Sequence, residues 1–266
     1  MFYKKNIGMM KRILLLLALF ATFHLPLRAQ FVHYGAQVGG GVSFVTDDLL
    51  TSSPIFAVGV GGYADYMFTE WKNPWSENIY LRTGLNINRR GTNFSQDLTH
   101  MESMRRGYYH NWYAQIPVIA GFRWEIPTLP AGNFINVFIG PSFNVGLFGR
   151  RWDRQVTMKM PQESFNYDTY ITGTKDDRAS FKHIRRLDAS VIFGVGYQWH
   201  NITVDIYMDH GFVPLMKRAD VLAPYDVAQG KTEETMTEQE IKDRNAYTGT
   251  NQAFLIAIGY QLPINR

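Results

Sequence analysis

Residues 112–124 read Trp112-Tyr113-Ala114-Gln115-Ile116-Pro117-Val118-Ile119-Ala120-Gly121-Phe122-Arg123-Trp124, an alternation of apolar residues with small or polar ones. Side chains point to opposite faces along a β-strand, so this segment has one apolar face and one mixed face. A tryptophan stands at each end of the apolar face. That placement is typical of strands that cross a membrane, because aromatic girdles lie at both interfaces.

Seven further segments alternate in the same way. They are residues 34–44, 56–68, 79–90, 135–147, 186–199, 202–209 and 254–262. Most are about 10–14 residues long, and a transmembrane strand needs about 9–11. Tyr197, Trp199 and Tyr260 again stand at the ends of apolar faces. The sequence therefore predicts an all-β fold, an eight-stranded antiparallel transmembrane β-barrel.

The connections between these segments alternate in length. The short ones are residues 69–77, 125–132 and 200–201, and the long ones are 91–108, 150–183 and 213–247. The connection after the first segment, residues 46–53, is of modest length. Bacterial barrels have short periplasmic turns and long extracellular loops. A chain that starts in the periplasm would place every long connection outside the cell.

The first 29 residues have the layout of a secretory signal peptide. Lys11 and Arg12 precede the apolar run 13–21, and Ala29 offers a small residue for cleavage. The apolar run is shorter than the roughly 20 residues of a membrane-spanning helix. We therefore predict a signal peptide over residues 1–29 and a barrel domain over residues 30–266. The absence of cysteine excludes a lipid anchor on cysteine and a disulfide framework.

The net charge of +4 arises from the predicted signal peptide. Residues 1–30 hold five of the 27 basic residues and no acidic one, so the rest of the chain has 22 basic against 23 acidic residues, a net charge of −1. Nucleic-acid binding requires a basic excess or a basic patch. The sequence thus predicts an exported protein with no nucleic-acid partner.

Three segments resemble strands of a known family. Residues 113–124 resemble the strand with an Ile-Pro pair that is typical of the PorT-like outer-membrane β-barrel family. Residues 138–143 resemble its next strand, and residues 188–197 resemble its strand that begins with aspartate and alternates with glycine. The resemblance implies an outer-membrane barrel. It also implies a link to protein export by the type IX route, which the founding member of the family supports.

A soluble, lipocalin-like barrel would show the same alternation with the apolar face turned inward. The second face of the segments argues against it. That face is rich in glycine and carries isolated charges such as Arg82, Arg123 and Asp188. A solvated surface favours lysine and glutamate, whereas a narrow polar lumen needs small residues and a few charges. The composition therefore favours the membrane barrel over the soluble one.

Eight charged residues fall on positions that are predicted to face the lumen. They are Arg82, Arg90, Arg123, Arg186, Asp65, Asp188, Asp205 and Asp209. An eight-stranded barrel has an interior just wide enough for side chains to fill it. Unpaired buried charges are costly, so these residues are expected to form ion pairs that plug the barrel. A path for protons or small solutes is the alternative.

The histidines give a weak indication of catalysis. His110, with Asp209 or His210, could form a catalytic pair at the rim of a barrel enzyme that acts on lipid or peptide. No metal-binding spacing such as His-Glu-x-x-His occurs in the sequence. We therefore predict no catalytic residue, no cofactor and no metal site.

The long connections are the better candidates for function, because binding residues concentrate on loops that a rigid scaffold holds. Residues 150–183 and 213–247 are predicted to contact protein partners, while the barrel wall contacts outer-membrane lipid. Thr237-Glu238-Gln239-Glu240 has the pattern of a capping box and predicts a short helix. The resulting hypothesis is a non-enzymatic outer-membrane barrel that anchors or interacts, as an accessory of type IX secretion. The alternatives are a barrel enzyme, a soluble ligand-binding barrel and a narrow channel.

Overall fold

The protein is a closed antiparallel β-barrel. The computed structural model describes residues 31–47, 50–68, 78–98, 103–158, 169–172, 184–218, 222 and 236–262. The predicted signal peptide lies outside the described residues. Eight of the described strands form the wall: β1 (Phe31–Thr46), β3 (Ile55–Met67), β4 (Ile79–Leu98), β5 (Ser103–Glu125), β6 (Asn133–Met158), β8 (Leu187–Trp199), β9 (Ile202–Gly211) and β12 (Thr250–Gln261). Each of the eight predicted segments lies within or largely within one of these strands.

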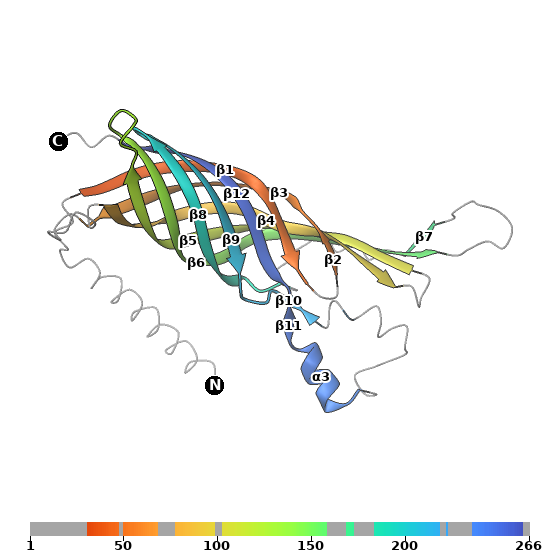
Figure 1. Ribbon diagram of the computed structural model, residues 1–266. Helices are drawn as coiled ribbons and strands as arrows, with labels where there is room; N and C mark the ends of the chain where they lie inside the picture. Colours follow the sequence, from red (N-terminus) through yellow and green to blue (C-terminus); the bar gives the residue numbers. More distant parts are fainter. Residues whose placement is uncertain are drawn as a thin grey trace.

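Every strand of the wall pairs with its neighbour in the chain, and β12 closes the barrel against β1. The short turns 126–132 and 200–201 lie at the end of the barrel where Gly35 of β1 meets Gln261 of β12. The longer connections lie at the other end, together with α3 (Glu238–Arg244), as Figure 1 shows. The predicted sorting is confirmed for the connections from β6 to β8 and from β9 to β12, whereas the connection from β4 to β5 at the same end is short. No helix within the described part of the chain is long and apolar enough to cross a membrane.

The apolar faces of the strands point away from the barrel axis. Phe56, Trp124 and Leu187 are 64%, 63% and 68% exposed, although all three are large and apolar. Asp65 and Arg90, in contrast, are each only 1% exposed because they point into the lumen. A soluble barrel would bury the apolar set and expose the charged set, so the lipocalin-like alternative is wrong.

The apolar band matches a bilayer in height. Trp112 and Trp124 lie twelve residues apart on β5. At about 3.4 Å per residue and a tilt of about 40°, twelve residues rise by about 31 Å along the barrel axis. The hydrocarbon core of a bilayer is about 30 Å thick. The two tryptophans therefore mark the outer and the inner interface.

Inward-facing glycines leave room for the polar side chains of neighbouring strands. A Cβ atom on Gly121 would lie 2.2 Å from Cζ of Tyr80, whose ring fills that space. A Cβ atom on Gly196 would lie 2.0 Å from Oδ1 of Asp205. The glycine-rich second face of the predicted strands is thus a consequence of crowding in a narrow lumen.

Gly61 and Gly62 provide a matched pair for testing the two faces. A Cβ atom on Gly61 would lie 1.9 Å from Oδ1 of Asn86 and 2.5 Å from the carbonyl oxygen of Leu85. On Gly62 it would find its nearest atom, the carbonyl oxygen of Gly35, at 3.6 Å. We expect Gly61→Val to lower the free energy of unfolding by about 1–3 kcal/mol and Gly62→Val to leave it nearly unchanged. Urea unfolding in lipid vesicles measures both, and equal effects would contradict the assignment of faces.

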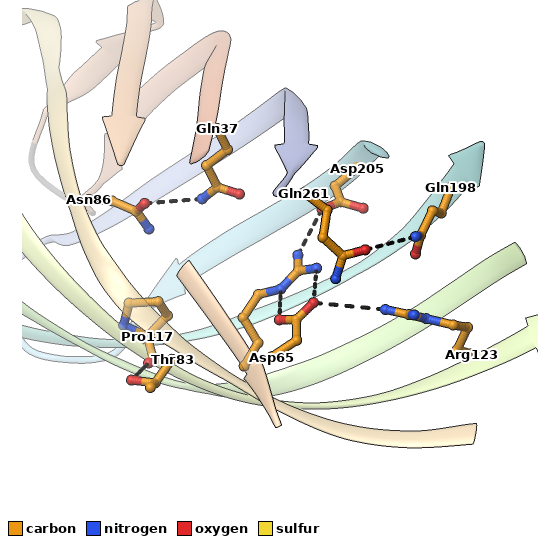
Figure 2. Close-up of polar contacts among 10 residues, drawn as sticks. Gln37, Asp65, Thr83, Asn86, Pro117, Arg123, Gln198, Asp205 and Gln261 are labelled. Atoms are coloured by element: carbon orange, nitrogen blue, oxygen red, sulfur yellow. Dashed lines mark hydrogen bonds and ion pairs between the residues drawn. The ribbon is translucent and has the colours of Figure 1, made fainter. Parts of the chain in front are cut away.

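Two prolines inside the strands are accommodated by local gaps in the ladder. The β4–β5 pairing omits the two positions 84 and 85, opposite Pro117, and resumes in the same register. The β5–β6 pairing omits the positions where Pro141 stands opposite Val118. A proline has no N–H to donate, so the gaps fall where no hydrogen bond could form. Oγ1 of Thr83 donates to the carbonyl oxygen of Pro117 at 2.9 Å and links the two strands across the gap (Figure 2).

Three strands are much longer than the sequence pattern predicts. β4, β5 and β6 contain 20, 23 and 26 residues, and they continue past the other strands of the wall (Figure 1). The predicted loop 91–108 is therefore wrong, because only residues 99–102 separate β4 from β5. The predicted loop 150–183 is wrong at its start, where β6 continues to Met158 and pairs with β7 (Thr169–Thr172). On these strands the apolar outer face ends at the membrane surface, whereas the hydrogen-bonded pairing of the strands continues beyond it.

Candidate functional site

The lumen on the periplasmic side of the barrel is filled by a buried ion-pair network around Arg82. Its Nε and Nη2 atoms donate to the two carboxylate oxygens of Asp65 at 2.7 and 3.0 Å, and its Nη1 atom donates to Asp205 at 3.0 Å. Nη2 of Arg123 lies 3.8 Å from the same Asp65 carboxylate. These residues come from four strands, and Figure 2 shows Asp65, Asp205 and Arg123 converging at this point. The network ties opposite sides of the barrel together.

A second network lies closer to the extracellular end. Nη2 of Arg90 donates to Asp209 at 2.6 Å, and Nε2 of Gln115 donates to the same carboxylate oxygen at 2.7 Å. Nδ2 of Asn88 donates to Oε1 of Gln115 at 2.6 Å. Nearby, Nδ2 of Asn251 donates to Asp188 at 3.3 Å. The strand positions set this arrangement, because each partner occupies an inward-facing position of its own strand.

The two networks close the lumen. A cavity of about 20 Å³ lies between the networks and is lined by residues that include Arg82 and Gln115. A cavity needs about 10–15 Å³ to hold one water molecule, so this one holds little more. The prediction of paired lumen charges is confirmed for Arg82, Arg90 and Arg123. Arg186, just before β8, is exposed and is not buried in the lumen as predicted.

The structure does not bring the candidate catalytic residues together. His110 lies on the outer face of β5, whereas Asp209 points into the lumen and pairs with Arg90. His210 is exposed on β9, and β9 is paired with β8 and β12 and not with β5. The rim pair that would support a barrel enzyme is therefore not formed.

An apolar cluster closes the extracellular end of the barrel. We call it the mouth cluster, and its buried members are Val45, Leu50, Phe94, Tyr109, Ile184, Leu215 and Met216. The rings of Phe94 and Tyr109 stack with their centroids 5.1 Å apart. Several members come from connections between the strands of the wall, so the cluster attaches those connections to the inner face of the extended β4 and β5.

The connection above the mouth cluster contains a short β-pair and a helix. β10 (Met216–Lys217) pairs with β11 (Tyr247–Thr248), and between them α3 begins after its N-cap residue, Thr237. The Thr237 side chain accepts from the N–H of Glu240, and the Glu240 carboxylate accepts from the N–H of Thr237, which confirms the predicted capping box. We call β10, β11, α3 and the protruding ends of β4, β5 and β6 the extracellular head. It contains the described parts of the predicted contact regions 150–183 and 213–247.

The sequence reasoning missed the mouth cluster and the protruding strands. Alternation continues beyond the predicted end of the third segment, since Thr92, Phe94 and Gln96 are buried while Asn93 is exposed. The outward residues of this stretch are polar, so the lipid-facing pattern stops although the strand does not. An alternation with a polar outer face would have been the signal for this extension.

The comparisons with known proteins agree with this architecture. A family model described as the outer membrane protein beta-barrel domain matches residues 27–217. None of the curated proteins matches the sequence. Among solved structures, Neisserial surface protein A has 8% identity and a TM-score of 0.39 over 86% of this chain and 97% of its own. Ail of Yersinia pestis, solved with the heparin analogue sucrose octasulfate, has 11% identity and a TM-score of 0.36 over 87% and 99%.

The N-terminal β-barrel domain of OprF from Pseudomonas aeruginosa is similar at 9% identity, with a TM-score of 0.26 over 86% of this chain and 97% of that domain. These structural similarities are too low to carry an argument about function. The family model, in contrast, covers well over half of the chain. With the outward apolar band and the closed sheet, it places the protein in the outer membrane. The chain belongs to the outer membrane protein beta-barrel domain family.

Proposed function

We propose that this protein is a non-enzymatic anchor that holds the extracellular head at the cell surface for contact with a protein partner. The observation that carries the proposal is a lumen closed by ion pairs beneath an ordered head. A channel would need a continuous polar path, and the cavity between the networks has a volume of only about 20 Å³. The separation of His110 from Asp209 removes the specific observation that favoured a barrel enzyme.

The head has the features of a presented surface. β4 to β6 hold it above the membrane, and the mouth cluster fixes the connection 212–249 to the barrel through Leu215 and Met216. The side chains of α3 are not buried, so this helix offers its surface to contact from outside. Rigid scaffolds that display loops are a common arrangement for binding proteins.

The structure suggests a head deletion that spares the barrel. The N–H of Arg218 donates to the carbonyl oxygen of Ala246 at 2.9 Å, so residues 218 and 246 already face each other at the end of the β10–β11 pair. Replacing residues 219–245 by an Asn-Gly turn should close this hairpin and preserve the mouth cluster.

A photo-crosslinking residue at Lys242 in the full chain should give a discrete crosslinked protein on whole cells.

The matched control carries the same crosslinker at Val60, which points to lipid. Photo-crosslinking at Val60 should give no such product. The variant that lacks residues 219–245 should no longer bind the partner. Planar-bilayer recordings of the full chain should show no channel. Protein crosslinks equal at Val60 and Lys242, or steady conductance, would contradict the proposal.

The resemblance to the PorT-like family supports a narrower form of the same role, an accessory of type IX protein secretion. The resembling segments, residues 113–124, 138–143 and 188–197, lie in the barrel wall and not in the head. Identification of the protein crosslinked at Lys242 tests this form directly. If the crosslinked protein is a component of the export machinery, the role in type IX secretion is supported. If it is a protein outside that machinery, this role is excluded.

A further inference from the structure

Three basic side chains lie together on the outer wall of the barrel, where β4, β5 and β6 leave the membrane. We call Arg89, His110 and Arg150 the rim patch. His110 stands directly opposite Arg150 in the β5–β6 ladder, a relation that brings side chains to about 5 Å of each other. Nη2 of Arg89, on the other neighbouring strand, lies 3.2 Å from Nδ1 of His110. Three adjacent strands thus each contribute one member.

The rim patch faces outward. On each strand, the residue that follows the rim-patch member is buried inside the barrel; these residues are Arg90, Asn111 and Arg151. Because consecutive side chains on a strand point to opposite faces, the rim-patch side chains point outward. The ring of Tyr108, also on the outer face of β5, stacks on that of His110 with centroids 4.3 Å apart. A guanidinium can only donate, so Nδ1 of His110 accepts from Arg89 and Nε2 carries the ring hydrogen. Nε2 is buried and has no acceptor among the described residues, so His110 serves to hold Arg89 and does not reach a ligand itself.

The depth of the rim patch corresponds to the headgroups of the outer leaflet. Directly below it, Trp112 and Phe148 are paired across β5 and β6 with ring centroids 5.9 Å apart. The register shifts between Trp112 and Tyr113, and this bulge leaves both Leu147 and Phe148 exposed on the outer face. His110 lies two residues beyond Trp112, which is about 5 Å farther from the membrane centre.

Among the residues that the structure describes, no acidic side chain balances the charge of the rim patch. The structure describes no carboxylate paired with Arg89 or Arg150, whereas the lumen arginines Arg82 and Arg90 both pair with aspartate. On the adjoining β3, the residue opposite Arg89 is Val58, which is apolar. Guanidinium groups bind phosphate oxygens through paired, charge-assisted hydrogen bonds. Two arginines at headgroup depth form a pair of donors that suits a phosphate group.

We propose that the rim patch binds a phosphate group of a phosphorylated glycolipid in the outer leaflet, with the acyl chains lying on the apolar wall below Trp112 and Phe148. Arg89 and Arg150 donate to the phosphate oxygens, and His110 holds Arg89 in place. This site is on the barrel wall and does not depend on the role of the extracellular head.

Lipid retention on the purified full-length barrel tests the proposal. The probes are lipid A, the same lipid with its phosphates removed, and inorganic phosphate, each with protein in phosphatidylcholine nanodiscs. Native mass spectrometry counts the lipid retained. We expect the wild-type protein to retain lipid A, and Arg89→Gln/Arg150→Gln to retain at least about tenfold less of it, because the charge-assisted hydrogen bonds are lost. The lipid without phosphates should not be retained.

Arg218→Gln is the matched control, because Arg218 is exposed in the head and outside the rim patch. It should retain lipid A as the wild type does. Equal retention by the double variant, or equal retention of the lipid without phosphates, would overturn the proposal. Complete displacement of lipid A by inorganic phosphate would show that free phosphate, and not the lipid, is the ligand. Should the double variant fail to fold, Arg150→Gln alone carries the test, since the exposed Arg150 side chain has no described hydrogen bond.

Discussion

Arg82→Met should lower the free energy of unfolding by about 3–5 kcal/mol, the range measured when one partner of a buried ion pair is removed. The reason is that Asp65 and Asp205 would remain buried without their main cationic partner. Both carboxylates accept hydrogen bonds from Arg82, and the remaining cation near Asp65, Arg123, lies 3.8 Å away. Urea unfolding in lipid vesicles, followed by the mobility of the folded barrel on unheated gels, measures the loss.

A triple variant separates the effect of buried carboxylates without a cationic partner from the effect of lost packing. In Arg82→Met/Asp65→Asn/Asp205→Asn the carboxylates are neutral, so we expect most of the lost stability to return. Arg218→Met serves as the control, because it removes an exposed arginine that lies outside the lumen. If Arg82→Met were as stable as the wild type, the ion-pair network would not be what holds the barrel closed.

Leu215→Asp should detach the connection 212–249 from the mouth cluster and leave the barrel folded. The Leu215 side chain is 2% exposed in the mouth cluster, and a carboxylate there would lose its hydration without gaining a partner in the cluster. Burial of an unpaired charge costs several kcal/mol, more than a peripheral cluster of seven side chains can absorb. The connection 212–249 would therefore separate from the inner faces of β4 and β5.

Limited proteolysis of whole cells measures this separation. The variant should be cut within residues 212–249 much faster than the wild type, while the barrel keeps its folded mobility on unheated gels. Ile241→Asp is the control, since α3 has no buried residue and the same substitution there should change neither property. Loss of the folded barrel in Leu215→Asp would show that the mouth cluster belongs to the core of the wall.

The strands of the wall could be predicted because lipid imposes a strict pattern on them. Phe56, Val58 and Val60 alternate with Ala57 and Gly59 because each lipid-facing position needs an apolar side chain and each inward position has little room. The predicted boundaries differ most from the structure where β4, β5 and β6 rise above the lipid. There the outer face meets water, so residues such as Asn93 carry no requirement for hydrophobicity.

The lumen could be predicted in composition but not in pairing. Arg82 and Asp65 are direct neighbours across β3 and β4, a relation that follows once the register is known. Asp205 is 123 residues from Arg82 in the sequence, and only barrel closure brings the two together. Arg186 follows the same alternation as the buried lumen residues, yet it precedes β8 and its side chain is exposed.

By itself, the sequence determined the outer-membrane barrel, the number of its strands, the direction of each face and the helix after Thr237, because all of these follow from local patterns of hydrophobicity and hydrogen bonding. Tertiary structure alone decided which charges meet, how the mouth is closed and where the rim patch lies. Those features join side chains from strands far apart in the chain, and no local pattern records the register that brings them together.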